Sequence, residues 1–466
     1  MERVSFGTEG FRGIIGYDFN FQTVERIAKA IASYVVENGG KRIVVGYDTR
    51  FLSKEFAEHA ALIASNHGVD AVISDNFCPS PVLSYATKTL GFNGGIMITA
   101  SHNPQKYNGI KFKSPLGGAV SNDVTSRLTE LIDRTVSENL YPGSFTKTID
   151  LKIHYKRGIK RFIDKTAHGS KRLKIIIDPM YGAGQNILAE IIGSIGHDVI
   201  EIRNTINPSF AGTNPEPVEK NLLPLIKTVI DKKADLGIAL DGDSDRIALV
   251  DARGRYIDAH KVFGLLLMYL AEELNLSKDV VKTVSGTEMV DKLCKHYRLN
   301  LHITKIGFKY ICELMQSNDV MIGGEESGGI GIASHIPERD PLLASILIIQ
   351  MMLKRKKSLD MLISDMIKIT GKYYYRRKDL HMSDAKNVSE FIVSNKDKLL
   401  KGFGDYEMSD LDGYKFQFKD GGFLMVRASG TEPVLRIYTE LNDVQKSNTM
   451  IEEFIGRLEK ITRRHL

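Results

Sequence analysis

The chain is poor in the features that mark secreted and membrane proteins. Only three cysteines occur, Cys78, Cys294 and Cys312, and their spacing fits neither a disulfide framework nor a metal site. No charged-then-apolar leader opens the sequence, and no apolar run approaches the roughly 20 residues that span a bilayer. The apolar runs at Val262–Leu270 and Ile346–Leu353 predict buried helices. We therefore expect a cytoplasmic protein with inert thiols and no membrane partner.

A strong charge of one sign is also absent. The 63 lysines and arginines against 57 aspartates and glutamates leave a formal net charge of +6 in 466 residues. This surplus is modest and spread along the chain, which argues against nucleic-acid binding. It is better suited to anionic small molecules.

Short β-rich runs alternate with helical stretches through most of the chain. Alternation on this scale predicts α/β sandwiches with mainly parallel, mixed sheets. Loops that carry chemistry should then cluster beyond the carboxyl ends of the strands. The predicted strands are 42–47, 71–74, 95–98, 173–177, 199–202, 236–240, 283–284, 303–306 and 320–322, with helices at 24–38 and 54–66.

The last part of the chain differs in pattern. Runs at 414–418, 423–427 and 434–439 predict an antiparallel hairpin set, which a helix over 444–463 closes. Breaks are expected near 140–155, 252–258 and 370–378. The sequence therefore predicts three similar α/β domains, 1–150, 151–254 and 255–371, and a smaller α+β domain, 372–466.

The stretch Thr99-Ala100-Ser101-His102-Asn103-Pro104 places a hydroxyl directly after an apolar strand. Pro104 keeps this loop from becoming a helix at once. Cationic and polar residues follow at Lys106, Asn108, Lys111 and Lys113. A turn in which Ser101 only caps backbone amides is the competing interpretation.

The stretch Asp241-Gly242-Asp243-Ser244-Asp245-Arg246 follows another apolar strand. Three carboxylates at alternate positions repel one another unless a cation intervenes, and oxygen ligands suit a hard ion such as Mg²⁺. An EF-hand calcium loop is excluded, because its sixth position needs glycine and its twelfth a glutamate, where Arg246 and Ala252 stand. A serine, a hard cation and an arginine together predict a phosphoryl-transfer centre.

Two further motifs have the composition of binding loops. Gly323–Gly329 combines glycines, which allow close backbone approach, with Glu325 and Ser327, which can bind vicinal sugar hydroxyls. Arg427–Pro433 offers a guanidinium, two hydroxyls and backbone amides suited to a phosphate. A plain turn is the alternative for each. By contrast, Glu338–Pro341 is explained by Asp340 capping a helix.

In this order the motifs resemble those of the α-D-phosphohexomutase superfamily. Phe6–Gly13 is similar to its amino-terminal signature. The stretch Thr99–Pro104 is similar to its phosphoserine loop, and the stretch Asp241–Arg246 to its metal loop. Gly324–Gly329 resembles its sugar loop and Arg427–Pro433 its phosphate loop. The resemblance implies four domains arranged as a heart around a central cleft.

The resemblance also implies roles for individual residues. Ser101 would carry the phosphoryl group, and Mg²⁺ would be held by Ser101 with Asp241, Asp243 and Asp245. Lys111 or Lys309 would be the general acid/base, with a pKa lowered among neighbouring cations. The catalytic residues would be Ser101, Lys111, His102, Arg12, Arg246 and Lys309. The substrate-binding residues would be Thr8, Glu325, Ser327, Arg427, Ser429, Gly430 and Thr431.

The implied reaction interconverts glucose 1-phosphate and glucose 6-phosphate through glucose 1,6-bisphosphate. Glu325–Gly329 and Ile306–Tyr310 resemble phosphoglucomutases more than phosphoglucosamine mutases, whose sugar loop usually ends in His where Gly329 stands. A phosphomannomutase or a bifunctional glucose/mannose enzyme is the alternative, and a phosphoglucosamine mutase is less favoured. A monomer or homodimer that binds a hexose phosphate, and neither nucleic acid nor a membrane, is expected.

Two other classes of protein remain open. A Mg²⁺-dependent sugar phosphatase would use Asp241 as nucleophile, would release free phosphate and would survive Ser101→Ala. A silent sensor would bind hexose phosphate without converting it. The intact set of serine, carboxylates and arginine argues against the sensor.

Overall fold

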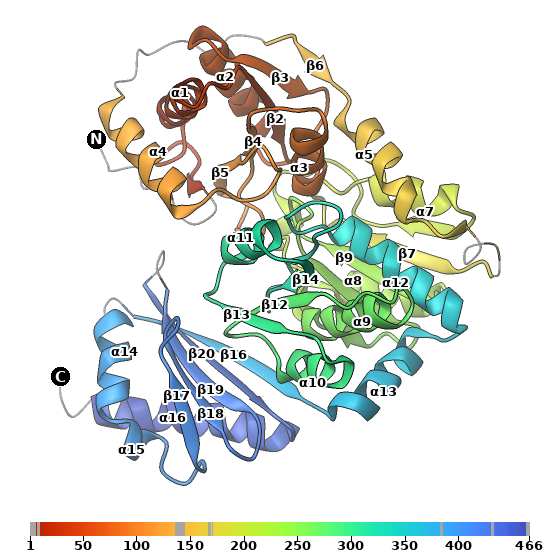
Figure 1. Ribbon diagram of the computed structural model, residues 1–466, viewed down its shortest axis with the longest axis vertical. Coiled ribbons are helices and arrows are strands. Elements are labelled where there is room, and N and C mark those ends of the chain that lie inside the picture. Colours follow the sequence, from red (N-terminus) through yellow and green to blue (C-terminus); the bar gives the residue numbers. More distant parts are fainter. Residues whose placement is uncertain are drawn as a thin grey trace.

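The computed structural model describes residues 6, 10–135, 145–165, 169, 171–382, 385–429 and 433–462. Four sheets, each with its own helices, follow one another along the chain (Figure 1). We propose that each sheet is the central sheet of one domain. The four domains have the predicted boundaries 1–150, 151–254, 255–371 and 372–466 and are numbered I to IV below. Among the described helices, none combines the length and apolar character needed to cross a bilayer.

The sheet of domain I is mixed and covered on both faces. Its order is β1-β5-β4-β2-β3-β6, with β2 parallel to β3 and β4, and β5 antiparallel to β4 and β1. Ile43 and Val45 of β2 join the core under α1 and α2, whereas Val44 joins the core under α3. The elements are β1 (Phe11–Ile14), α1 (Phe21–Glu37), β2 (Arg42–Tyr47), α2 (Ser53–Asn66), β3 (Asp70–Ser74), α3 (Ser80–Thr89), β4 (Gly95–Ile98), β5 (Tyr107–Lys113), α4 (Asn122–Arg134) and β6 (Thr148–Ile149).

Domain II contains a five-stranded mixed sheet in the order β11-β10-β9-β7-β8. Its central strands β7 and β9 are parallel and apolar, so they are buried on both faces. The elements are α5 (Leu151–Ile159), β7 (Lys174–Asp178), α7 (Ile187–Ser194), β8 (Asp198–Glu201), α8 (Leu223–Asp231), β9 (Leu236–Leu240), β10 (Ile247–Asp251) and β11 (Tyr256–Ile257), with 3₁₀ turns at Lys160–Phe162, Phe210–Gly212 and Glu219–Asn221.

Domain III has the sheet order β13-β12-β14-β15, and its core is continuous with that of domain II and with α3. The side chain of Asp340 caps α12 by accepting the N–H of Leu343, and Pro341 occupies the first turn, as predicted. The elements are α9 (Ala259–Glu272), β12 (Asp279–Thr283), α10 (Glu288–Tyr297), β13 (Leu301–Thr304), α11 (Phe308–Ser317), β14 (Val320–Gly324), β15 (Ile330–Ile332), α12 (Pro341–Arg355) and α13 (Leu359–Thr370).

Domain IV is built on an antiparallel sheet in the order β16-β20-β19-β18-β17. In Figure 1 it lies at the end of the molecule away from domain I, with domain III between them. The elements are β16 (Tyr374–His381), α14 (Ala385–Ser394), α15 (Lys396–Leu399), β17 (Tyr406–Ser409), β18 (Tyr414–Phe418), β19 (Phe423–Ala428), β20 (Val434–Leu441) and α16 (Val444–Thr462).

The structure confirms the predicted fold class, and it has strand structure at the expected breaks. The expected break near 370–378 is mostly strand β16, whose charged residues Arg376, Arg377 and Lys378 hide its β character. The expected break near 252–258 is a hairpin turn followed by β11. Within the turn, the N–H of Asp251 donates to Arg255 O. All three thiols are buried and free, as expected. Of the expected break near 140–155, residues 140–144 lie outside the described residues, and the rest contains β6 and the start of α5.

Candidate active site

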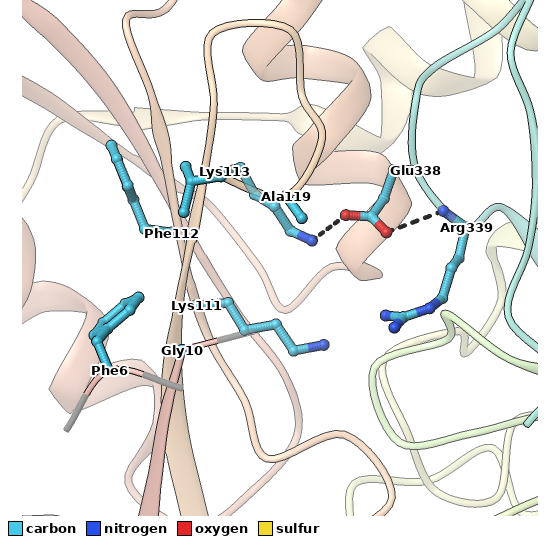
Figure 2. Close-up of a pocket in the computed structure, with 9 residues that line it drawn as sticks. Phe6, Gly10, Lys111, Phe112, Lys113, Ala119, Glu338 and Arg339 are labelled. Atoms are coloured by element: carbon cyan, nitrogen blue, oxygen red, sulfur yellow. Dashed lines mark hydrogen bonds and ion pairs between the residues drawn. The ribbon is translucent and has the colours of Figure 1, made fainter. Parts of the chain in front are cut away.

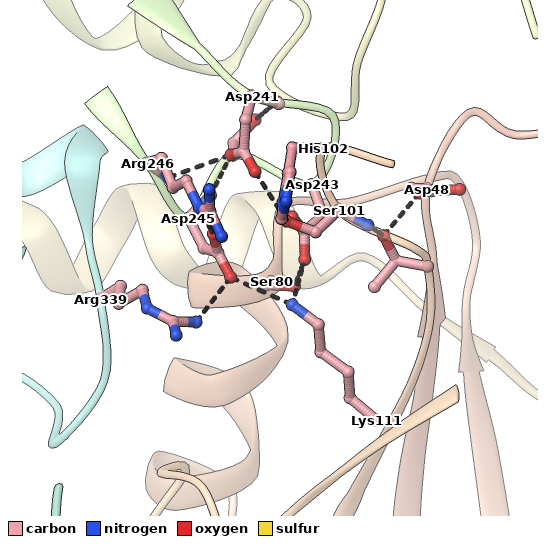
Figure 3. Close-up of polar contacts among 12 residues, drawn as sticks. Asp48, Ser80, Ser101, His102, Lys111, Asp241, Asp243, Asp245, Arg246 and Arg339 are labelled. Carbon is pink, nitrogen blue, oxygen red and sulfur yellow. Dashed lines mark hydrogen bonds and ion pairs between the residues drawn. The ribbon is translucent and has the colours of Figure 1, made fainter. Parts of the chain in front are cut away.

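Ser101 lies directly after β4 in a loop with a special backbone geometry. Its φ is 51°, in the left-handed region that disfavours a residue with a Cβ. The Thr99 hydroxyl holds the turn by accepting the N–H of Ser101 at 2.8 Å. The Ser101 side chain is buried, and its Oγ donates to Asp241 Oδ2 at 2.8 Å (Figure 3). The structure therefore brings the Thr99–Pro104 loop and the Asp241–Arg246 loop into contact.

A buried arginine that the sequence analysis missed holds this loop in place. The Arg50 guanidinium donates to the backbone oxygens of Ser101 at 2.6 Å and Asn103 at 2.7 Å. Its Nε lies 3.2 Å from Asp48, which also accepts the Thr99 hydroxyl at 2.6 Å. Asp48 and Arg50 follow β2, the parallel neighbour of β4, so they lie at the same edge of the sheet as Ser101. This position after a predicted strand is the sequence signal that could have identified them.

The aspartate loop follows β9 and packs against the Ser101 loop. A Cβ on Gly242 would lie less than 3.0 Å from Ser101 O, so only glycine allows this approach. The three aspartates are buried, and one carboxylate atom from each lies within 4.8 Å of the others. Asp241 Oδ1 accepts the N–H groups of Asp245 and Arg246 at 2.8 and 3.0 Å, which fixes the turn.

These carboxylates fit a divalent cation. Asp243 Oδ1 and Asp245 Oδ1 are buried and accept no hydrogen bond from any described residue. Burial and the two neighbouring carboxylates raise the pKa of Asp241 well above its ordinary value. A hard cation among the three would satisfy both orphaned oxygens and remove the repulsion. Oxygen donors alone favour Mg²⁺ over a softer metal.

Lys111 reaches this centre from β5, but not with the pKa that the sequence analysis expected. Its Nζ donates to Asp243 Oδ2 at 2.7 Å and to Asp245 Oδ2 at 3.0 Å (Figure 3). Burial disfavours the ammonium, yet the two aspartates outweigh burial and raise the pKa of Lys111 above its ordinary value. The expected lowering is wrong, because the carboxylates lie closer than the neighbouring cations.

Arg12, His102 and Arg246 line the same centre. Arg12 donates to Asn103 Oδ1 at 2.7 Å, and Arg246 Nε lies 3.9 Å from Asp245 Oδ1. His102 Nδ1 lies 3.4 Å from Ser101 Oγ. Burial and the surrounding cations hold the pKa of His102 well below its ordinary value, so its ring is neutral at neutral pH.

The residues predicted to bind the sugar lie between β14 and β15, beside the aspartate loop. Gly328 has a φ of 97°, and its carbonyl accepts the N–H of Ile247, the first residue of β10. Glu325 is buried, which raises its pKa, and its Oε2 accepts Arg339 Nε at 3.0 Å. Ser327 is half-buried in the same loop.

Arg339 and Glu338 belong to this site, although the sequence analysis explained their motif by a helix cap alone. Arg339 Nη1 donates to Asp245 Oδ2 at 2.9 Å, so one guanidinium joins the sugar loop to the aspartate loop. Glu338 forms a buried ion pair with Lys113. Both residues line a small pocket with Phe6 and Lys111 (Figure 2). Their charges were visible in the sequence, but their distant partners were not.

The remaining predicted residues lie further away or outside the described residues. Lys309 donates to Asn122 Oδ1, at the start of α4, rather than to the aspartates. Arg427 belongs to β19 of domain IV, where its Nε donates to Asp412 Oδ1 at 2.9 Å. The Ser429 N–H bonds to Val434 O at 2.8 Å, so these two residues on either side of the undescribed 430–432 pair with each other. Thr8, Gly430 and Thr431 lie outside the described residues.

The comparisons with known proteins define the class. Four domain families match in order: phosphoglucomutase/phosphomannomutase α/β/α domain I at 3–139, domain II at 154–254, domain III at 258–369 and the C-terminal domain at 388–456. The chain belongs to the phosphoglucomutase/phosphomannomutase family of the α-D-phosphohexomutase superfamily, as the sequence resemblance predicted. It is therefore a phosphohexomutase, an enzyme of the phosphotransferase and isomerase type.

Relatives within this family differ in the sugar that their names specify. A phosphoglucomutase/phosphomannomutase of Thermococcus kodakarensis is 31% identical, covering 98% of each chain. A phosphoglucosamine/phosphogalactosamine mutase of Sulfurisphaera tokodaii is 29% identical, covering 96% of this chain and 97% of its own. A crystal structure from Thermus thermophilus, described as that of a phosphomannomutase, has a TM-score of 0.89 and 31% identity, covering 98% of this chain and 99% of its own.

Proposed function

We propose that the enzyme interconverts glucose 1-phosphate and glucose 6-phosphate through a phosphoserine at Ser101 and a glucose 1,6-bisphosphate intermediate. The observation that carries the proposal is the 2.8 Å hydrogen bond between Ser101 Oγ and Asp241 within the buried aspartate cluster. This bond supports the proposal, because it keeps the Ser101 hydroxyl beside the carboxylates that would hold a divalent cation. Positioning and charge neutralisation are what phosphoryl transfer requires.

Each residue then has a definite part in the reaction. Asp241, Asp243 and Asp245 would hold Mg²⁺, which would neutralise charge on the phosphoryl oxygens. Arg246 binds the same phosphoryl group, and Arg50 keeps Ser101 in its strained position. The phosphoserine gives its phosphoryl group to the free sugar hydroxyl, and the opposite phosphate later returns to Ser101. Lys111 is held as an ammonium by Asp243 and Asp245, so in this scheme it gives its proton to the departing Ser101 oxygen and regains one from the attacking sugar hydroxyl.

The sugar and the phosphate that does not react are held further out. Glu325 and Ser327 bind sugar hydroxyls, Arg427, Ser429, Gly430 and Thr431 hold the second phosphate, and Thr8 is a further substrate-binding residue. Binding energy from the second phosphate then supports turnover at the first. His102 and Arg12 line the centre, and Lys309 ties the start of α11 to domain I through Asn122.

The preference for glucose over glucosamine is supported by Gly329. A Cβ at this position would lie 2.5 Å from Arg339 Nε and 3.0 Å from Glu325 Oε2. A histidine there would displace Arg339 from Glu325. The space that a sugar-loop histidine needs is occupied in this chain by an arginine.

An amino-sugar substrate is the second candidate, because the Sulfurisphaera tokodaii relative is named for glucosamine and galactosamine. A phosphomannomutase activity is the third, on the name of the Thermococcus kodakarensis relative. These substrates share the phosphoryl chemistry at Ser101. Mannose differs from glucose in the configuration at C2, and glucosamine carries an amino group there in place of the hydroxyl.

One coupled assay tests the proposal. The enzyme is given glucose 1-phosphate, Mg²⁺ and a trace of glucose 1,6-bisphosphate, and both glucose 6-phosphate and free phosphate are followed. The same assay is repeated with mannose 1-phosphate and glucosamine 1-phosphate. Glucose 6-phosphate without free phosphate is the expected result, with the largest kcat/KM for glucose. Release of free phosphate that persists in Ser101→Ala would instead support the phosphatase.

A further inference from the structure

Asp412 connects two parts of the molecule with one carboxylate. It lies in the turn between β17 and β18 of domain IV. Its Oδ1 accepts Arg427 Nε at 2.9 Å, and its Oδ2 accepts the backbone N–H of Ile306 at 2.8 Å. Ile306 belongs to domain III and precedes α11, which carries Lys309 in its first turn. One side chain therefore joins the predicted phosphate-binding arginine to domain III.

The turn that carries Asp412 is packed firmly. The next residue, Gly413, has a φ of 82°, and a Cβ there would lie 2.5 Å from Val426 O on β19. The side chains of Asp412 and Arg427 are only 20% and 17% exposed. A sheltered ion pair on a fixed turn holds a guanidinium in one orientation better than a solvated pair does.

Charge explains why Arg427 needs this partner. Arg427 lies directly opposite Arg436 in the β19–β20 ladder, so two arginine side chains project from the same face of the sheet at neighbouring positions. Like charges directly opposite destabilise a sheet and drive side chains apart. Asp412 offsets the charge of Arg427. Because Nε is the nitrogen engaged by Asp412, a phosphate would be bound through the two Nη nitrogens, in the bidentate manner typical of arginine.

The Ile306 end of the bridge lies on an interface rather than in solvent. The side chain of Ile306 packs on a cluster formed by Val284 of domain III with Phe423, Met425 and Tyr438 of domain IV. Asp412 thus fixes Arg427 relative to domain III as well as within its own sheet.

We propose that Asp412 is a positioning residue for substrate binding, which orients Arg427 and ties it to domain III through Ile306. The inference rests on the proposed function, because it takes Arg427 as the ligand of the non-reacting phosphate. Loss of Asp412 leaves the chemistry at Ser101 intact but weakens the binding of the non-reacting phosphate by Arg427. It therefore raises KM more than it lowers kcat.

The test uses the full-length enzyme with glucose 1-phosphate as substrate. Asp412→Ala and Asp412→Asn are each expected to raise KM about tenfold and to lower kcat less than fivefold. Asp405→Asn is the matched control, because Asp405 pairs with Lys419 at the other end of the same two strands. The control should leave KM unchanged. Circular dichroism and thermal unfolding verify that each variant folds; Asp412→Asn preserves shape if Asp412→Ala does not fold.

A double mutant distinguishes this inference from the proposed function. If Asp412 acts through Arg427, Asp412→Asn added to Arg427→Ala raises KM no further. A raised KM in Arg427→Ala with an unchanged KM in Asp412→Asn would overturn the role of Asp412 alone. Independent, multiplying effects of the two substitutions would also overturn it. An unchanged KM in Arg427→Ala would overturn the phosphate role of Arg427 and the role of Asp412 together.

Discussion

At the scale of single residues, the account depends on how a serine is held in an unfavourable conformation. Ser101 adopts a φ of 51°, and the Arg50 guanidinium bonds to the carbonyl groups around it. A left-handed residue with a side chain costs on the order of 1–3 kcal/mol, which the surrounding contacts must offset. Loss of Arg50 should therefore disturb the conformation of the Ser101 loop while the aspartates can still bind the metal.

Arg50→Lys tests this view of the Ser101 loop. A lysine keeps the charge beside Asp48 but cannot donate to four carbonyl oxygens in the fixed planar geometry of a guanidinium. We expect kcat to fall at least about a hundredfold, since small displacements of reacting groups are that costly. The KM for glucose 1-phosphate should change little. Steady-state kinetics would contradict the account if kcat in the folded variant matched that of the parent.

The contact between the two central loops gives a second prediction at this scale. In Gly242→Ala the new methyl group would collide with Ser101 O, so the loops must separate. We expect loss of both activity and Mg²⁺ affinity, measured by kinetics and calorimetry. Gly193→Ala is the control: a Cβ there meets open space in α7, and alanine should stabilise the helix by roughly 0.5–1 kcal/mol. Normal activity in Gly242→Ala would show that close approach is unnecessary.

At the scale of elements, domain IV is attached through the start of α10. Glu440 of β20 accepts the N–H of Glu288 at 2.7 Å, while Glu288 Oε1 accepts the N–H of Gly422 at 2.9 Å. The two glutamates therefore fasten β20 and the β18–β19 turn to one helix end. Burial raises the pKa of Glu440 to about 7.

This raised pKa makes the attachment sensitive to pH. The unfolded chain releases the Glu440 proton near pH 4.3, whereas the folded chain holds it until about pH 7. Its contribution to stability is therefore fully present below the unfolded pKa and lost as the pH rises through the folded pKa. Relative to the parent, Glu440→Gln should gain free energy of unfolding between pH 5 and about 7.5. Denaturant unfolding across this range measures the difference, and a constant difference would refute the expectation.

The sequence predicted most elements because their apolar runs are local signals. β2, β4, β9 and β18 have the predicted bounds. Strand β16 escaped because its polar residues leave no apolar alternation, and β17 because it is short and exposed. Ser101 and the three aspartates were predicted to meet, since both motifs follow strands. The partners of Arg50 and Arg339 were not predictable, because pairing between distant loops leaves no local pattern.

At the scale of the whole molecule, the centre is assembled from three domains. Domain I contributes Ser101 and Lys111, domain II the aspartates, and domain III Arg339. A cation bound at this junction should therefore stabilise the complete fold and not only one loop. Stabilisation by a ligand follows its concentration relative to Kd.

Metal removal tests this assembly. Treatment with EDTA should abolish turnover and lower the melting temperature, and added Mg²⁺ should restore both. At a hundred times Kd the metal contributes about 2.7 kcal/mol. Asp243→Asn should lose the Mg²⁺-dependent rise in melting temperature while it remains folded in the absence of metal. Activity that survives EDTA and exhaustive dialysis would count against the metal site.

The most direct measurement follows the phosphoryl group itself. Parent enzyme and Ser101→Ala are incubated with glucose 1,6-bisphosphate and Mg²⁺, and then analysed by intact-protein and peptide mass spectrometry. The parent is predicted to gain one phosphoryl group on Ser101, which excess glucose 6-phosphate removes, whereas Ser101→Ala gains none and interconverts no sugar phosphate. A phosphoryl group on another residue, or full turnover by Ser101→Ala, would contradict the account.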